Sequence, residues 1–145
     1  MNTQIEEELL SAWMSMSLNI RGNRLLTSLS FNEIVVCSFL YRNMKEGEEL
    51  LTATDLCSQT KLLKSQLNKV LNEMEKKGLV ERIRSKEDKR KVFLKLREEK
   101  ISVYLEEHKK VMQIVHRVCD ALGEEKTGLL TELIWETLEV MENEY

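Results

Sequence analysis

Proline is absent from all 145 residues of this chain, although average usage would supply roughly seven. Because proline breaks helix interiors and marks loops, its absence favours long helices joined by short connections. Hydrophobic residues make up 42% of the chain and charged residues 32%, which excludes the collagen-like and disordered classes. The length suits one domain, with or without helical extensions. We therefore expect a mostly helical fold.

Two helices are predicted in the first third of the chain. The first covers about residues 3–20, where apolar side chains recur every three or four positions. The second begins after Ser30, because Ser30 and Glu33 have the spacing of a capping box and Leu29 can act as a hydrophobic staple. It ends near Lys45 and is apolar on nearly all sides, which predicts a place at the centre of the core.

A short helix and a longer one are predicted next. The short helix covers about residues 53–59, with Leu56 and Cys57 facing inward. The longer helix ends at two lysines followed by Gly78, a typical helix stop. Leu63 precedes its first residues, and a leucine side chain cannot accept hydrogen bonds from the free N–H groups of the first turn. Either Thr60 or a shifted turn caps this helix, or its start is frayed. Its inward residues would be Leu67, Val70, Leu71 and Met74.

The hydrophobic period then changes from helical to extended. Residues 79–84 and 91–96 both show partial alternation of apolar and polar side chains, and residues 85–90 between them are wholly polar. This pattern predicts a β-hairpin with a charged tip, and these are the only strands that the sequence predicts. A long helix follows from Arg97 to a stop at Gly123, and a last helix carries a second apolar stripe.

Charge is distributed unevenly along the chain. The net charge is −3, but residues 61–100 hold 14 basic and seven acidic residues, a balance of +7. The remainder holds eight basic and 18 acidic residues, a balance of −10. A local positive field of this kind is typical of a surface that binds a polyanion. Lysines that merely solvate a hairpin and a helix face are the alternative.

The order of the elements favours a nucleic-acid partner. A short helix, a tight turn, a second helix and a hairpin form a winged helix-turn-helix, whose second helix can enter the DNA major groove. Polar side chains that can pair with bases or phosphates would lie outside near the start of that helix. These candidates are Lys64, Ser65, Gln66, Asn68 and Lys69.

Residues 52–96 resemble the DNA-binding half of the MarR (multiple-antibiotic-resistance regulator) family of winged-helix repressors. The resemblance lies in LTATDLCSQT, in KSQLNKVLNEMEKKGLVER and in the hairpin tip EDKRK leading into VFLKL. It implies that Arg90 lies at the wing tip and reaches the minor groove, and that Asp88 braces the wing. Further candidates for DNA contact on the hairpin are Arg84, Lys89 and Lys91.

The resemblance also implies a homodimer built from the terminal helices. Residues 29–97 would form the DNA-binding part, and residues 1–22 and 98–145 the dimerisation helices, of a single regulator spanning residues 1–145. Packing of these helices within one chain is the alternative. The candidate interface residues are Ile5, Leu9, Trp13, Leu129, Leu133, Ile134, Trp135, Leu138 and Met141.

These observations predict a cytoplasmic transcriptional regulator, in the first instance a repressor, that binds a palindromic double-stranded DNA site as a homodimer. A winged-helix module that binds another protein is the alternative. A small-molecule effector is left open as a partner, and no membrane is expected because no apolar run reaches the ~18 residues of a membrane span.

No cofactor, metal or enzymatic activity is expected. His108 and His116 lie about 12 Å apart along a helix, too far to share a metal, and the phosphate-loop and hydrolase motifs are absent from the sequence. Cys37, Cys57 and Cys119 are odd in number and contain no C-x-x-C pair, so neither a disulfide framework nor a zinc site is indicated. Cys37 and Cys57 are expected to be buried thiols, and Cys119 is the candidate for an accessible one.

Overall fold

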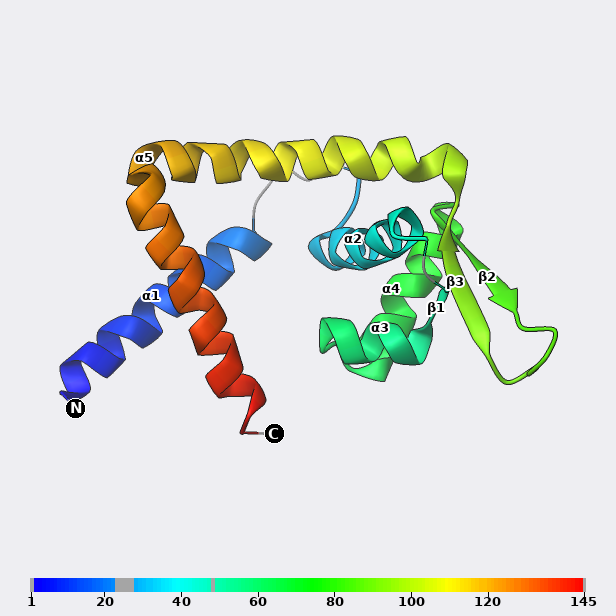
Figure 1. Ribbon diagram of the computed structural model, residues 1–145, viewed down its shortest axis with the longest axis horizontal. Helices are drawn as coiled ribbons and strands as arrows, with labels where there is room; N and C mark the ends of the chain where they lie inside the picture. The colour runs from blue at the N-terminus through cyan, green and yellow to red at the C-terminus, as the bar shows by residue number, and fades with distance from the viewer. Residues whose placement is uncertain (1, 23–27, 48, 145) are drawn as a thin grey trace. The chain divides into compact units, whose positions relative to one another are not determined.

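The computed structural model describes residues 2–22, 28–47 and 49–144. It contains two compact units, Met1–His108 and Lys109–Tyr145, which we describe separately. The winged segment within the first unit comprises α2 (Phe31–Lys45), β1 (Leu51–Thr52), α3 (Ala53–Thr60), α4 (Lys64–Lys76), β2 (Val80–Arg84) and β3 (Val92–Leu96). Figure 1 shows the β2–β3 hairpin extending away from the three helices. The predicted winged helix-turn-helix is confirmed.

Helix α2 starts where the sequence predicts. The Ser30 hydroxyl accepts the backbone N–H of Glu33, and the Glu33 carboxylate accepts the backbone N–H of Ser30 at 2.8 Å, so both free N–H groups are satisfied. The apolar residues of α2 meet those of α3, α4 and the sheet in one core. Its fully buried side chains are Val36, Cys37, Leu40, Leu56, Leu67, Leu71, Met74, Val80, Leu94 and Leu96.

The sheet has three strands rather than the two that were predicted. The order is β1-β3-β2, with all pairs antiparallel, and β1 pairs Leu51 with Leu94 and Thr52 with Phe93. The strand β1 is only two residues long, which is too short to show alternation in the sequence. It ends at Thr52, whose side chain also caps α3, so the strand passes directly into the helix-turn-helix.

The turn between α3 and α4 satisfies one backbone N–H at the start of α4, although the Leu63 side chain makes no cap hydrogen bond. Lys61 adopts the left-handed conformation with φ 60°, and the chain then enters α4 at Lys64. The Gln66 side-chain oxygen accepts the backbone N–H of Leu63 at 3.0 Å, while Thr60 accepts from Leu62 instead. Thr60 therefore does not cap α4, and the start of the helix is not shifted.

The remaining helices are α1 (Thr3–Arg21) and α5 (Ile101–Glu142), the latter preceded by a short 3-10 turn, η1 (Glu98–Lys100). Helix α1 buries none of its residues. Gly123 interrupts α5 with φ 82° and ψ 166°, a conformation that only glycine adopts readily, so the predicted stop at this residue is present as a break between two helical parts.

Candidate nucleic-acid interface

The exposed face of α4 carries all five side chains that the sequence singled out. Lys64, Ser65, Gln66, Asn68 and Lys69 are exposed, while Leu67, Leu71 and Met74 on the opposite side are buried. Val70, which was expected to face inward, is half-buried at the edge of the helix. The hydrophobic spacing thus orients the helix, leaving its polar residues available to a ligand.

A groove joins α4 to the hairpin and to the start of α3. It brings Asn68 of α4 together with Arg84, Arg90 and Lys91, four of the nine candidate DNA-contact residues. Two carboxylate residues also line it, and one of them, Asp55, caps α3 through the backbone N–H of Thr52 at 2.8 Å. The groove therefore combines cationic side chains of the hairpin with a hydrogen-bonding side chain of the helix.

The other candidates do not line this groove. Gln66 and Lys69 face a second hollow between α4 and the start of α2, together with Glu33, Glu73 and Lys77. Gln66 also uses its side-chain oxygen to hold the start of its own helix. Because an amide oxygen has two lone pairs, Gln66 keeps one acceptor position and its amide donors for a ligand.

The tip of the hairpin is a tightly bonded turn. The Asp88 carboxylate accepts the backbone N–H of Arg90 at 3.0 Å, and the Asp88 backbone N–H donates to the Ser85 hydroxyl. The backbone carbonyl of Asp88 accepts from the N–H of Lys91 at 2.9 Å. These bonds fix the backbone at Arg90, whose side chain is exposed.

The two arginines of β2 bind other parts of the protein. The Arg84 guanidinium donates to the backbone carbonyl of Lys89 at 3.2 Å, so it braces the tip. Arg82, which sequence reasoning missed, donates to the Asn72 side chain of α4 at 2.9 Å and forms an ion pair with Glu75 at 3.3 Å. The spacing of Arg82 and Arg84, two residues apart on one strand face, was the available signal.

The candidate dimer residues are all exposed. On α1, Ile5, Leu9 and Trp13 are 55%, 63% and 38% exposed, and the six candidates on α5 are 39–64% exposed. Isolated exposed apolar residues are ordinary, but contiguous stripes of this kind mark interaction surfaces.

The cysteines and histidines show no sign of a reactive or metal site within residues 2–22, 28–47 and 49–144, where no group of three potential ligands is found. Cys37 is buried, and this burial, with the Glu33 carboxylate as a smaller cause, raises the pKa of its thiol to about 12. Cys57 is half-buried rather than buried, and so is Cys119. His108 and His116 are both exposed.

The helix-turn-helix followed by a hairpin defines a winged-helix protein. Residues 29–91 match the model of the MarR family. The HTH-type transcriptional regulator FarR of Neisseria gonorrhoeae is 35% identical over 86 residues, which are 59% of this chain and 59% of FarR. The similarity to the MarR family therefore covers residues 29–91, which include the helix-turn-helix and the first strand of the hairpin.

Solved structures show the same fold. FabT of Streptococcus pneumoniae, solved in complex with DNA, has a TM-score of 0.70 at 20% identity and covers 99% of both chains. PcaV of Streptomyces coelicolor, solved with its natural ligand, has a TM-score of 0.76 at 15% identity and covers 96% of both chains. In the part of the chain that the structure describes, no helix has the length and apolar character needed to cross a membrane.

Proposed function

We propose that this chain is a transcriptional regulator that binds double-stranded DNA sequence-specifically as a homodimer. The observation that carries the proposal is the groove in which Asn68 of α4 meets Arg84, Arg90 and Lys91 of the hairpin. A helix of this kind fits the major groove, and an arginine on a fixed turn beside it fits the adjacent minor groove. The complex of FabT with DNA supports this assignment.

Each candidate residue has a role in this proposal. Exposed side chains of α4 contact bases and phosphates, Lys89, Arg90 and Lys91 contact the DNA backbone or minor groove, and Asp88 braces the wing. Arg84 contributes positive charge while it holds the tip through Lys89. The α4 residues are Lys64, Ser65, Gln66, Asn68 and Lys69.

The terminal regions supply the dimer in this proposal. Residues 1–22 and 98–145 would form the dimerisation helices, and the exposed apolar stripes of α1 and α5 would be covered by a second copy. A two-fold dimer places two recognition helices about 34 Å apart, which matches a palindrome with half-sites one helical turn apart. We further propose a cytoplasmic protein without enzymatic activity, acting as a repressor, with a small-molecule effector as a further partner. FarR, a transcriptional regulator, supports the regulatory role, and PcaV with its natural ligand supports a small-molecule effector.

Binding of the duplex upstream of its own gene, followed by fluorescence anisotropy against an unrelated duplex of equal length, tests the proposal. We expect a Kd in the range of about 10⁻⁸ to 10⁻¹¹ M at physiological salt, at least about 10³-fold tighter than for the unrelated duplex. Affinity should fall steeply as salt rises, because phosphate contacts release counterions. Equal and salt-independent binding of both duplexes would favour the protein-binding alternative.

A further inference from the structure

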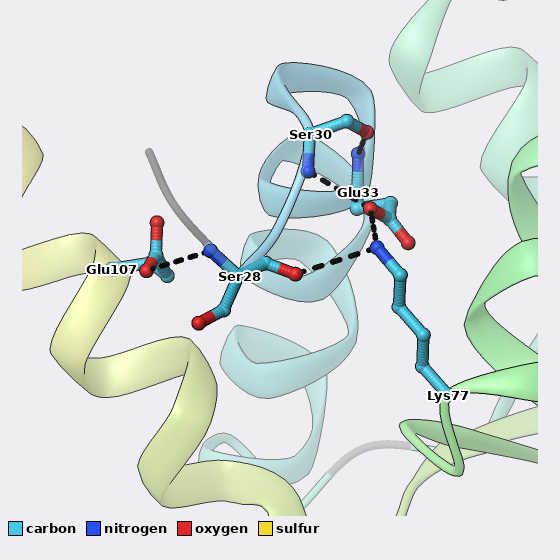
Figure 2. Close-up of polar contacts among 5 residues, drawn as sticks. All are labelled: Ser28, Ser30, Glu33, Lys77 and Glu107. Carbon is cyan, nitrogen blue, oxygen red and sulfur yellow. Dashed lines mark hydrogen bonds and ion pairs between the residues drawn. The ribbon is translucent and has the colours of Figure 1, made fainter. Parts of the chain in front are cut away.

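Both backbone polar groups of Ser28 are held by side chains from distant helices. Figure 2 shows Ser28 between Glu107 of α5 and Lys77 at the end of α4. The Ser28 backbone N–H donates to the Glu107 carboxylate at 3.3 Å, and the Lys77 ammonium donates to the Ser28 carbonyl at 3.3 Å. Ser28 precedes α2, so three helices converge on this one residue.

The Lys77 ammonium also lies against a buried carboxylate. Its nitrogen is 2.7 Å from Glu33 Oε1, which accepts the backbone N–H of Ser30 as well. The Glu33 side chain is 4% exposed and the Lys77 side chain 41%, so the lysine reaches inward from the surface. A short charge-assisted bond of this kind is directional, and loss of the cation would leave a buried charge uncompensated.

We propose that Lys77, Glu33 and Glu107 are positioning residues for DNA binding, which hold the end of α4 in a fixed relation to the first turns of α5. This inference rests on the proposed function of α4. Lys77 is the C-cap of α4, and Lys64 is its first residue, about 20 Å away along the helix. A tilt of about 3° at the Lys77 end would displace the Lys64 end by about 1 Å, which is enough to spoil contacts that need placement within about 0.5 Å.

These three residues act without touching DNA. The charge of Lys77 is matched by Glu33, and Lys77 follows the C-terminal end of α4, although it lines one hollow with Gln66 and Lys69. The buried Glu107 is 1% exposed and is connected to Lys77 at the end of α4 through Ser28. The expected result of breaking the connection is therefore a loss of sequence discrimination, with the phosphate contacts retained.

Lys77→Met tests this with a closely matched control, Lys76→Met. Lys76 is the adjacent lysine, its side chain is 74% exposed, and among the described residues it pairs with its neighbour Glu73 on the same helix. The probes are a duplex selected by the wild-type protein from a random pool and an unrelated duplex. We expect Lys77→Met to weaken binding of the selected duplex about three- to thirtyfold, with the unrelated duplex and the salt slope changed little. Lys77→Arg should restore most of the affinity, and Lys76→Met should change neither Kd more than about twofold.

Glu107→Ala tests the connection to α5. It should also weaken binding of the selected duplex. Its effect should be less than additive with that of Lys77→Met, because both substitutions break the same series of hydrogen bonds. Equal losses on both duplexes, or fully additive effects, would overturn the inference. If Lys77→Met fails to fold, Glu33→Gln combined with Lys77→Met removes the buried charge and takes its place in every comparison.

Hydrogen exchange without DNA separates this inference from the proposed function. The Lys77 backbone N–H donates to the Glu73 carbonyl in the last turn of α4. We expect Glu107→Ala to accelerate exchange of this N–H, while a core amide elsewhere, such as that of Leu40, keeps its rate. An unchanged Lys77 rate would overturn the connection even if the wild-type protein binds DNA. If the wild-type protein binds no duplex selectively, the proposed function fails, and the role of these residues in DNA binding fails with it. Faster exchange of the Lys77 N–H in Glu107→Ala would then show a structural connection between α4 and α5 and nothing more.

Discussion

The winged segment buries most of its apolar side chains, whereas the helices outside it leave many of theirs exposed. In the winged segment, Leu56, Leu67 and Met74 are fully buried, and the outer surface is polar with an excess of positive charge. Helix α1 buries no residue, and the part of α5 beyond residue 108 keeps Leu129 and Leu133 about half exposed. We call α1 and this part of α5 the flanking helices.

This difference assigns different kinds of partner to the two regions. Helices α2, α3 and α4 and the sheet complete each other's core, so the outer surface of the winged segment is mostly polar, with Leu63, Phe31 and Ile83 as exposed apolar exceptions. A mostly polar, positively charged surface suits a polyanion. The flanking helices have apolar stripes and a surrounding excess of acidic residues, which suits a second copy of the chain and disfavours DNA. The following predictions test this division, beginning with the largest expected effect.

Leu133→Glu should break the dimer. Leu133 is 49% exposed in the single chain, and in the proposed interface the new carboxylate would be buried without a partner. Analytical ultracentrifugation should show the mass of one chain instead of two. Affinity for the selected duplex should fall about 10²-fold or more, because the two half-sites are no longer bound by one linked particle.

Glu139→Gln is the control for this change, since it alters the charge of the same helix by one unit at an exposed polar position. It should remain dimeric. A dimeric Leu133→Glu protein with full DNA affinity would show that the stripe of α5 is not the interface, and the division between the two regions would lose its main support.

Leu67→Ala should destabilise the protein by about 2–5 kcal/mol, because it leaves a cavity in the closed core. The measurement is the free energy of unfolding from urea titration. Leu63→Ala is the matched control, since Leu63 occupies the N-cap position of the same helix without a side-chain cap bond and is 67% exposed; its effect should stay within about 0.5 kcal/mol. Equal costs for the two leucines would contradict the orientation of α4.

Arg90→Ala should lower DNA affinity about tenfold on both the selected and the unrelated duplex, and reduce the salt slope by about 1 if the side chain binds phosphate. Anisotropy titrations at several salt concentrations measure both quantities. Lys126→Ala removes one positive charge from the flanking part of α5 and should change neither. A loss confined to particular sequences would indicate that Arg90 reads the width of the minor groove.

Local patterns predicted most of the winged segment from the sequence. The capping pair Ser30 and Glu33, the stop at Gly78 and the change of period at the hairpin each depend on residues close in the chain. The strand β1 escaped prediction because two residues carry no period, and pairing with β3 rather than propensity creates it.

The candidate site was harder to predict, because hydrogen bonds and ion pairs within the protein decide which side chains remain available to contact DNA. Exposure of Asn68 and Lys69 followed from helical spacing. The bond by which Gln66 holds the start of its own helix is a local contact with Leu63, whereas the binding of Arg82 to Glu75 depends on how α4 lies against β2. The connection from Glu107 to Lys77 joins residues 30 positions apart through a third residue, and no local pattern reports such a contact.

Cys37 gives the smallest expected effect, a stability difference at high pH. Its pKa is about 12 in the folded protein and 9.0 for an ordinary thiol, because burial disfavours the thiolate. Between these values the unfolded chain loses the proton first, so the thiol favours the folded state fully below pH 9 and loses that contribution as pH rises toward 12. At pH 9.5 the loss should be about 1 kcal/mol.

Urea titrations of the wild-type protein and Cys37→Ala at pH 7.5 and 9.5 measure this difference. The variant is less stable at both values because of its cavity, but its deficit should shrink by about 1 kcal/mol at the higher pH. Val36→Ala is the matched control, since Val36 is the neighbouring fully buried residue of α2 and does not ionise; its deficit should be the same at both pH values. A constant deficit for Cys37→Ala would mean that water reaches the thiol, and that the core of the winged segment is less completely closed than the contrast with the flanking helices requires.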